Sequence, residues 1–152
     1  MRDSSHAQIH RRLLKGIALA AFTMLAPACG SDGGGTPTTP VVTSVVGTWN
    51  LKTVNAISLP FTLQASDPKV EVLARQYVIA SNGTFTFSST LRNTELDGSS
   101  TSTRLTDSGS YVLADNFVAF TSGKDGTSVI ASVTTTSMTI VAGTFTQVFT
   151  KE

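Results

Sequence analysis

The chain has 152 residues and a formal net charge of +1, with 40 % hydrophobic and 14 % charged residues. This length suits one ordinary domain, and the near-neutral charge provides no basic field that would attract nucleic acid. Both histidines, His6 and His10, lie near the start, and Cys29 is the only cysteine. Because residues 30–152 contain no His and no Cys, Ser-His-Asp catalysis, Cys-His catalysis and zinc sites built on His or Cys are excluded there.

The first 28 residues have the composition of a cleaved export signal. Residues 1–15 are polar and end in a basic cluster, and residues 16–26, GIALAAFTMLA, form an apolar run of eleven. A membrane-spanning helix needs about 20 apolar residues, so this run is too short to span a bilayer and suits the core of a signal peptide. Without residues 1–28 the chain would keep seven basic and nine acidic residues.

The junction after the apolar run resembles the lipobox of bacterial lipoproteins, because Ala28 and Cys29 match its last two positions. The resemblance implies cleavage before Cys29 and a lipid on its sulfur and its new amino group. Two or more acyl chains anchor a protein stably to a membrane. Since Gly30, not an aspartate, follows the cysteine, the resemblance implies the outer membrane of a cell envelope. The alternative is an ordinary signal peptide with an unused cysteine.

Residues 29–44 are expected to form the lipidated cysteine and a flexible tether. Gly33, Gly34 and Gly35 favour flexibility, whereas Pro37 and Pro40 favour extended backbone. No period typical of a buried face is present in this stretch. We therefore place the start of the folded domain at Val45 and its end at residue 152; the alternative is that residues 30–44 are a surface loop of that domain.

From Val45 onward the apolar residues alternate with polar ones, which is typical of half-buried strands. In VVGTWNLKTV, the residues Val45, Gly47, Trp49 and Leu51 share one face. The clearest hairpin joins residues 77–81 to 84–91 through Asn82-Gly83, a pair that suits a tight type I′ turn. Further strands are predicted over residues 99–106, 109–114, 117–122, 129–134, 137–142 and 145–151.

Residues 55–74 depart from this regular pattern. Pro60 and Pro68 disfavour a central strand. We predict a short edge strand or a crossing loop, followed by a strand that begins near Val70. A short helix over residues 68–74, capped by Asp67, is the competing interpretation. The apolar segment 59–61 would act either as a lid or as a plug at the barrel mouth.

Short turns between seven or eight strands require antiparallel neighbours. The sequence therefore predicts an all-β domain, and a small antiparallel up-and-down β-barrel buries one face while removing exposed strand edges. A sandwich of two open sheets is the main alternative.

The stretch VVGTW at residues 45–49 resembles the opening of lipocalin-like (calycin) domains, in which a Gly-x-Trp motif lies on the first barrel strand. Gly47 and Trp49 match this motif. The resemblance implies that Trp49 packs across the closed end of the barrel beneath a basic residue from late in the chain. Lys151 is the candidate, because it lies in phase with Phe145, Gln147 and Phe149, and a cation over an indole ring is favourable.

The large aromatic side chains are expected to line the interior, either as packed core or as the wall of a ligand cavity. They are Trp49, Tyr77, Phe85, Phe87, Tyr111, Phe120, Phe145 and Phe149. The acidic residues fall mostly in turns, which favours solvation over paired acid–base catalysis. We therefore expect a non-enzymatic envelope lipoprotein without metal or cofactor, held to the membrane through Cys29, that binds a small hydrophobic ligand. The alternative is a solid barrel whose outer surface contacts envelope components or a protein partner, for which the sequence names no candidate.

Overall fold

The computed structural model describes residues 41–152, so the predicted signal peptide, Cys29 and most of the predicted tether lie outside the described residues. The described part contains ten strands, and no helix in it is long and apolar enough to cross a membrane. The strands are β1 (Gly47–Val54), β2 (Ile57–Ser58), β3 (Phe61–Gln64), β4 (Lys69–Ile79), β5 (Thr84–Thr94), β6 (Ser100–Ala114), β7 (Phe117–Ser122), β8 (Ser128–Val133), β9 (Ser137–Ala142) and β10 (Phe145–Lys151).

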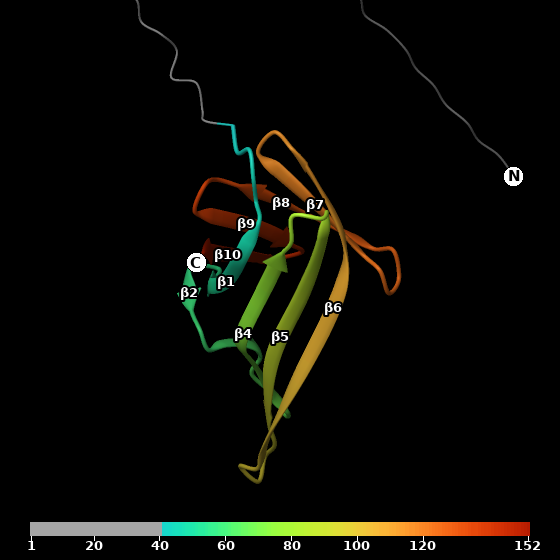
Figure 1. The fold of residues 1–152 in the computed structure, drawn as a ribbon. Coiled ribbons are helices and arrows are strands. Elements are labelled where there is room, and N and C mark those ends of the chain that lie inside the picture. Colours follow the sequence, from blue (N-terminus) through green and yellow to red (C-terminus); the bar gives the residue numbers. More distant parts are fainter. Residues whose placement is uncertain (1–40) are drawn as a thin grey trace, which may run out of the picture. The chain divides into compact units, whose positions relative to one another are not determined.

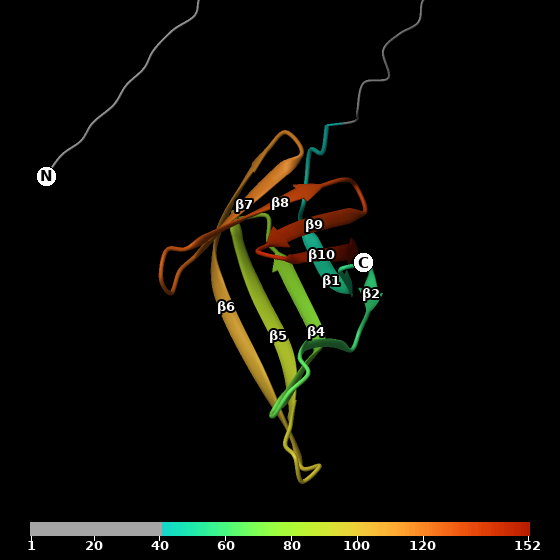
Figure 2. The ribbon, with the colours of Figure 1, turned by 180° about the vertical axis from the view of Figure 1, so that it is seen from behind.

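Eight of these strands close into an antiparallel barrel (Figures 1 and 2). From β4 to β10 each strand is hydrogen-bonded to the next, β10 pairs with β1, and β1 returns to β4. At the closure Trp49 lies opposite Lys151 on one side and opposite Tyr77 on the other. The prediction of an all-β up-and-down barrel is therefore confirmed, and the sandwich alternative is wrong.

The segment that follows β1 forms two short strands at the ends of the hydrogen-bonded order, β2 against β1 and β3 against β4. Asn55 and Ala56 both have positive φ, of 50° and 64°, and turn the chain sharply between β1 and β2. The predicted edge strand is β3, and β4 begins at Lys69, next to the predicted start at Val70. The alternative of a helix over residues 68–74 is wrong, because that stretch lies in the ladder between β3 and β5.

The turn between β4 and β5 differs from the expected type I′ turn. Only Gly83 has positive φ, of 84°, and Asn82 does not. The Ala80 amide donates to the Thr84 carbonyl at 2.9 Å, which encloses a three-residue loop ending in a left-handed glycine. Asn82 contributes through its side chain, because its Oδ1 accepts hydrogen bonds from the amide and the hydroxyl of Thr84.

β6 is one continuous strand of 15 residues, where the sequence predicted two segments. Its first half pairs only with β5, and its pairing with β7 begins at Gly109. The first half of β6 and the part of β5 that pairs with it, together with β4, therefore extend beyond β7 (Figure 1). At Gly109 the two strands approach so closely that a Cβ atom would lie 1.9 Å from the carbonyl oxygen of Thr121. Only glycine allows this approach, so Gly109 marks where β6 enters the barrel.

The packed core lies on the inner face of the barrel, and its largest fully buried side chains include Trp49, Phe149, Ile79 and Met138. Burial also extends ahead of β1. Val42 is 5 % exposed, and its amide donates to Asn116 Oδ1 at 2.9 Å. The folded part thus includes Val42, a residue that the sequence predicts to lie in the tether.

Candidate ligand cavity

The barrel interior is not completely filled, because side chains of β4 to β10, together with Thr127, line a partly open cavity of about 270 Å³. Most of its wall is apolar or aromatic, and a few polar groups share it. Such a combination is typical of small-molecule sites. The lining residues are Arg75, Tyr77, Phe85, Phe87, Asp107, Phe120, Ser122, Thr127, Val129, Ile140, Ala142 and Gln147.

Half of the predicted aromatic residues contribute to this wall. Tyr77 is its centre: its ring stacks on Phe120 with centroids 4.7 Å apart, and contacts Phe87 at 4.9 Å and Phe85 at 5.8 Å. These contacts fix the orientation of the rings, so the wall is pre-formed.

The other four predicted aromatic residues do not line the cavity. Trp49 and Phe149 are fully buried, Tyr111 donates from its hydroxyl to the Ala80 carbonyl at 3.0 Å, and Phe145 packs edge-on against Phe61 at 5.9 Å. The interior thus combines the two predicted alternatives, a packed core and a cavity wall, in different regions.

The cavity has a polar region centred on Arg75. Its Nε donates to Ser89 Oγ at 3.1 Å, and its Nη1 donates to Gln147 Oε1 at 2.7 Å. Burial lowers the pKa of the Arg75 guanidinium, and the nearby Tyr77 hydroxyl partly opposes this shift. Burial raises the pKa of Tyr77 to about 12; Arg75 lowers it and Asp107 raises it further, so the phenol stays protonated at neutral pH.

The predicted site residues do not include Arg75, Ser89, Asp107 or Gln147. The sequence does indicate that two of them face the interior: Gln147 lies between Phe145 and Phe149, and Arg75 lies two residues before Tyr77. A polar residue in phase with inward-facing aromatic residues occupies the buried face of a strand. Asp107 and Ser89 lie in Ser- and Thr-rich stretches, where the alternation gives no such contrast.

Gly47 and Trp49 of the Gly-x-Trp motif meet the basic residue Lys151 at the seam between β1 and β10. Lys151 Nζ lies 5.5 Å from the centroid of the Trp49 ring, and Trp49 Nε1 donates to the Val45 carbonyl at 2.8 Å. Gly47, with φ of 137°, leaves room for the lysine stem, because a Cβ atom there would lie 2.9 Å from Lys151 Cε. The lysine and the indole ring therefore pack together where β1 meets β10.

In the apolar segment 59–61, for which a lid and a plug are the two predicted roles, the last residue lies in the barrel core. Phe61 is 7 % exposed and lies opposite Val72 on β4, and Leu59 packs partly buried against the same core. Because Phe61 and Leu59 already belong to the packed core, this segment is not a free lid.

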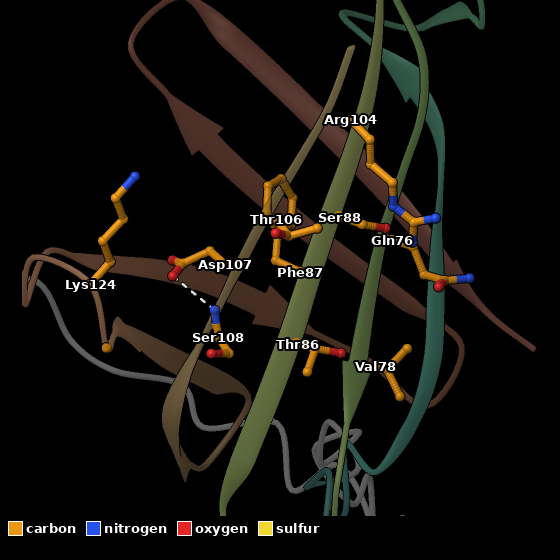
Figure 3. A pocket seen from close by; sticks show the side chains of 11 residues that line it. Gln76, Val78, Thr86, Phe87, Ser88, Arg104, Thr106, Asp107, Ser108 and Lys124 are labelled. Carbon is orange, nitrogen blue, oxygen red and sulfur yellow. Dashed lines mark hydrogen bonds between the residues drawn. The ribbon is translucent and has the colours of Figure 1, made fainter. Parts of the chain in front are cut away.

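A larger polar groove of about 610 Å³ runs over the outer surface of β4, β5 and β6 (Figure 3). Arg104 and Lys124 lie on opposite sides of it, with the hydroxyl groups of Thr86, Ser88 and Thr106 between them. Its threonines and its arginine are exposed, so these groups are solvated without a ligand. The smaller interior cavity is the stronger candidate, since it combines an aromatic wall with a partly buried charge.

Acidic residues do not gather into a metal site in the described part of the chain, where no three His, Cys, Asp or Glu side chains are close enough to hold an ion. Glu71 instead forms ion pairs with Lys69 at 2.8 Å and Arg92 at 2.7 Å. Hydrogen bonds from Lys69 and Arg92 lower the pKa of Glu71. This cluster joins β4 to β5 and is structural.

No protein-family model and no curated protein sequence matches this chain. Among solved structures, the chain is similar to an uncharacterized protein from Bacteroides eggerthii DSM 20697. That comparison has a TM-score of 0.41 and 16 % sequence identity, and it covers 70 % of this chain and 98 % of that protein. The chain is described by its fold, a small antiparallel β-barrel.

Proposed function

We propose that this chain is a lipid-anchored envelope protein of lipocalin-like type whose barrel binds a small, largely hydrophobic ligand. The observation that carries the binding function is the interior cavity of about 270 Å³ with its wall of Tyr77, Phe85, Phe87 and Phe120. A barrel filled by its own side chains would leave no such space. The Trp49–Lys151 contact beside Gly47 supports the lipocalin-like comparison.

The proposed anchor is a lipid on Cys29, and the proposed location is the outer membrane of a bacterial envelope. Ala28-Cys29 after an apolar run of eleven supports the anchor, and Gly30 supports the outer membrane. Growth with an alkyne-tagged fatty acid should label the wild-type chain, and Cys29→Ser should abolish the label. Equal labelling of both chains would contradict lipidation at Cys29.

The binding function is tested by native mass spectrometry of the full chain purified from a bacterial envelope. We expect a small apolar molecule to remain bound to the wild type. Ala142→Trp fills the cavity from an exposed position in its lining, and should release that molecule. Ala114→Trp adds the same volume at an exposed position outside the lining and should retain it. A bound molecule that survives in both variants would place the ligand elsewhere.

A second candidate function, contact with a protein partner, is favoured by a row of apolar side chains on the outer surface. Val112, Ile130 and Val141 are 68 %, 64 % and 67 % exposed, and Val112 and Ile130 flank Ala119 from opposite sides in the ladder. Surface patches of this kind often mark interfaces. Replacing all three by threonine should abolish crosslinking to an envelope partner without changing cavity binding.

A further inference from the structure

Arg75 is unusual because it faces inward on β4, on the same side as Tyr77 and Ile79. Its two hydrogen-bonding partners are themselves buried, with Ser89 1 % and Gln147 7 % exposed. These contacts hold the guanidinium in one orientation against the cavity. An arginine held in this way is pre-organised to bind a ligand group, because little side-chain freedom remains to be lost.

The hydrogen bonds orient Arg75 but do not neutralise it. Both acceptors are uncharged, and within residues 41–152 the only carboxylate that forms ion pairs within 4.0 Å is Glu71, with Lys69 and Arg92. A partly buried charge that forms no ion pair gains free energy when an anion binds to it. Arg75 is therefore available to an anionic group that enters the cavity.

The other residues of the cavity wall indicate what kind of molecule would carry the anionic group. Apart from Arg75, the cavity is lined mainly by the rings of Tyr77, Phe85, Phe87 and Phe120 and by aliphatic side chains of β8 and β9. A volume of about 270 Å³ equals roughly nine water molecules at ~30 Å³ each. This suits a short apolar tail with one small head group.

Asp107 restricts the charge of that head group. It lines the same cavity, and its Oδ1 accepts a hydrogen bond from the Ser108 amide at 2.8 Å. A ligand with two negative charges would meet repulsion from this carboxylate, whereas a monoanion can place its charge on Arg75.

We propose that Arg75 binds the carboxylate of a small amphipathic monocarboxylic acid whose apolar tail lies against the aromatic wall. This inference rests on the proposed function, because it assigns the ligand class of the same cavity. A carboxylate can accept two parallel hydrogen bonds from a guanidinium, and the Nη2 group of Arg75 donates none within residues 41–152.

The test uses the full chain in a maltoside detergent and three probes with the same tail: octanoate, octanol and octylamine. Binding is followed by the NMR signal of the Arg75 Nε–H group, which reports on the site and not on partition into detergent. Octanoate should bind about 10- to 100-fold more tightly than octanol, as expected for a hydrogen bond between charged groups. Arg75→Gln should lose this preference, as measured by the signals of the Tyr77 and Phe120 rings.

Two further variants keep the test decisive if Arg75→Gln is poorly folded. Asp107→Asn removes the repelling carboxylate and should raise the preference for octanoate over octanol several-fold. Arg104→Gln removes an exposed arginine from the outer groove and should change neither. Equal binding of octanoate and octanol would overturn the role of Arg75 but leave the proposed binding function intact. Preference for octylamine would overturn it in favour of Asp107, and no binding of any probe would overturn both proposals.

Discussion

Gly47→Ala is expected to destabilise the barrel at its closing seam. Gly47 has φ of 137°, which an L-residue adopts at a cost of about 1–3 kcal/mol. The added methyl group would lie 2.9 Å from Lys151 Cε and would push the lysine away from Trp49. Loss of that cation–π contact adds about 0.5–1 kcal/mol. The total, about 1.5–4 kcal/mol, corresponds to roughly 6–17 °C in the melting temperature of a domain of this size.

The assay is urea unfolding followed by the fluorescence of Trp49, the only tryptophan, which is fully buried in the folded state. A double-mutant cycle separates the two contributions. Lys151→Ala removes both the clash and the cation, so Gly47→Ala should cost about 0.5–1 kcal/mol less in that background. Gly98→Ala is the matched control, because Gly98 also has positive φ, of 83°, but no atom lies within 4 Å of an added Cβ.

Two results would refute this explanation of the motif. One is a Gly47→Ala domain that unfolds within about 0.5 kcal/mol of the wild type, the ordinary range of a neutral surface substitution. The other is strict additivity with Lys151→Ala. Additivity would show that the glycine is needed for its backbone conformation alone and has no connection with the lysine above the indole.

Two further substitutions test the fold and the cavity. Gly109→Ala should lower the free energy of unfolding by about 2–5 kcal/mol in the same urea assay, because its Cβ would force β6 from β7 at the Thr121 carbonyl; Ser110→Ala next to it should cost less than about 0.5 kcal/mol. The domain should also lose about 2–3 kcal/mol between pH 10 and about 12, since the folded state raises the pKa of Tyr77 and stability falls as the phenol ionises. Tyr77→Phe should flatten this alkaline limb, and an unchanged limb would contradict the burial of the phenol.

The barrel could be predicted from sequence because its determinants are local. Alternation around Trp49 and the run of short turns define antiparallel strands, and closure follows from the need to cover their edges. The turn at Asn82-Gly83 was located correctly but assigned the wrong type, because Asn82 acts through its side chain, not through a left-handed backbone. The continuity of β6 was missed because its exposed first half has no apolar phase to join to the second.

The charged part of the cavity could not be predicted for a different reason. The pairing of β4 with β5 shifts between Val72 and Ala74, so Val72 and Arg75 both belong to the inner face although they are three residues apart. A strict period of two places these residues on opposite faces. The partners of Arg75 come from 14 and 72 residues further along the chain. Contacts of this separation depend on barrel register, which the sequence pattern does not define.

The interior has two regions with different consequences for the protein. Around Trp49, Met138 and Phe149 the side chains are fully buried, and this region supplies most of the apolar burial that stabilises the barrel. Around Arg75 and Gln147 the interior holds a cavity and a polar network that contributes little to folding, since replacing a whole buried polar network by apolar residues is often neutral or stabilising. The triple variant Arg75→Leu, Ser89→Ala and Gln147→Leu removes the charge together with its two buried acceptors, so it should leave the urea midpoint unchanged or raise it while abolishing carboxylate binding. Such a separation of stability from binding distinguishes a site for a ligand from an imperfection in the core.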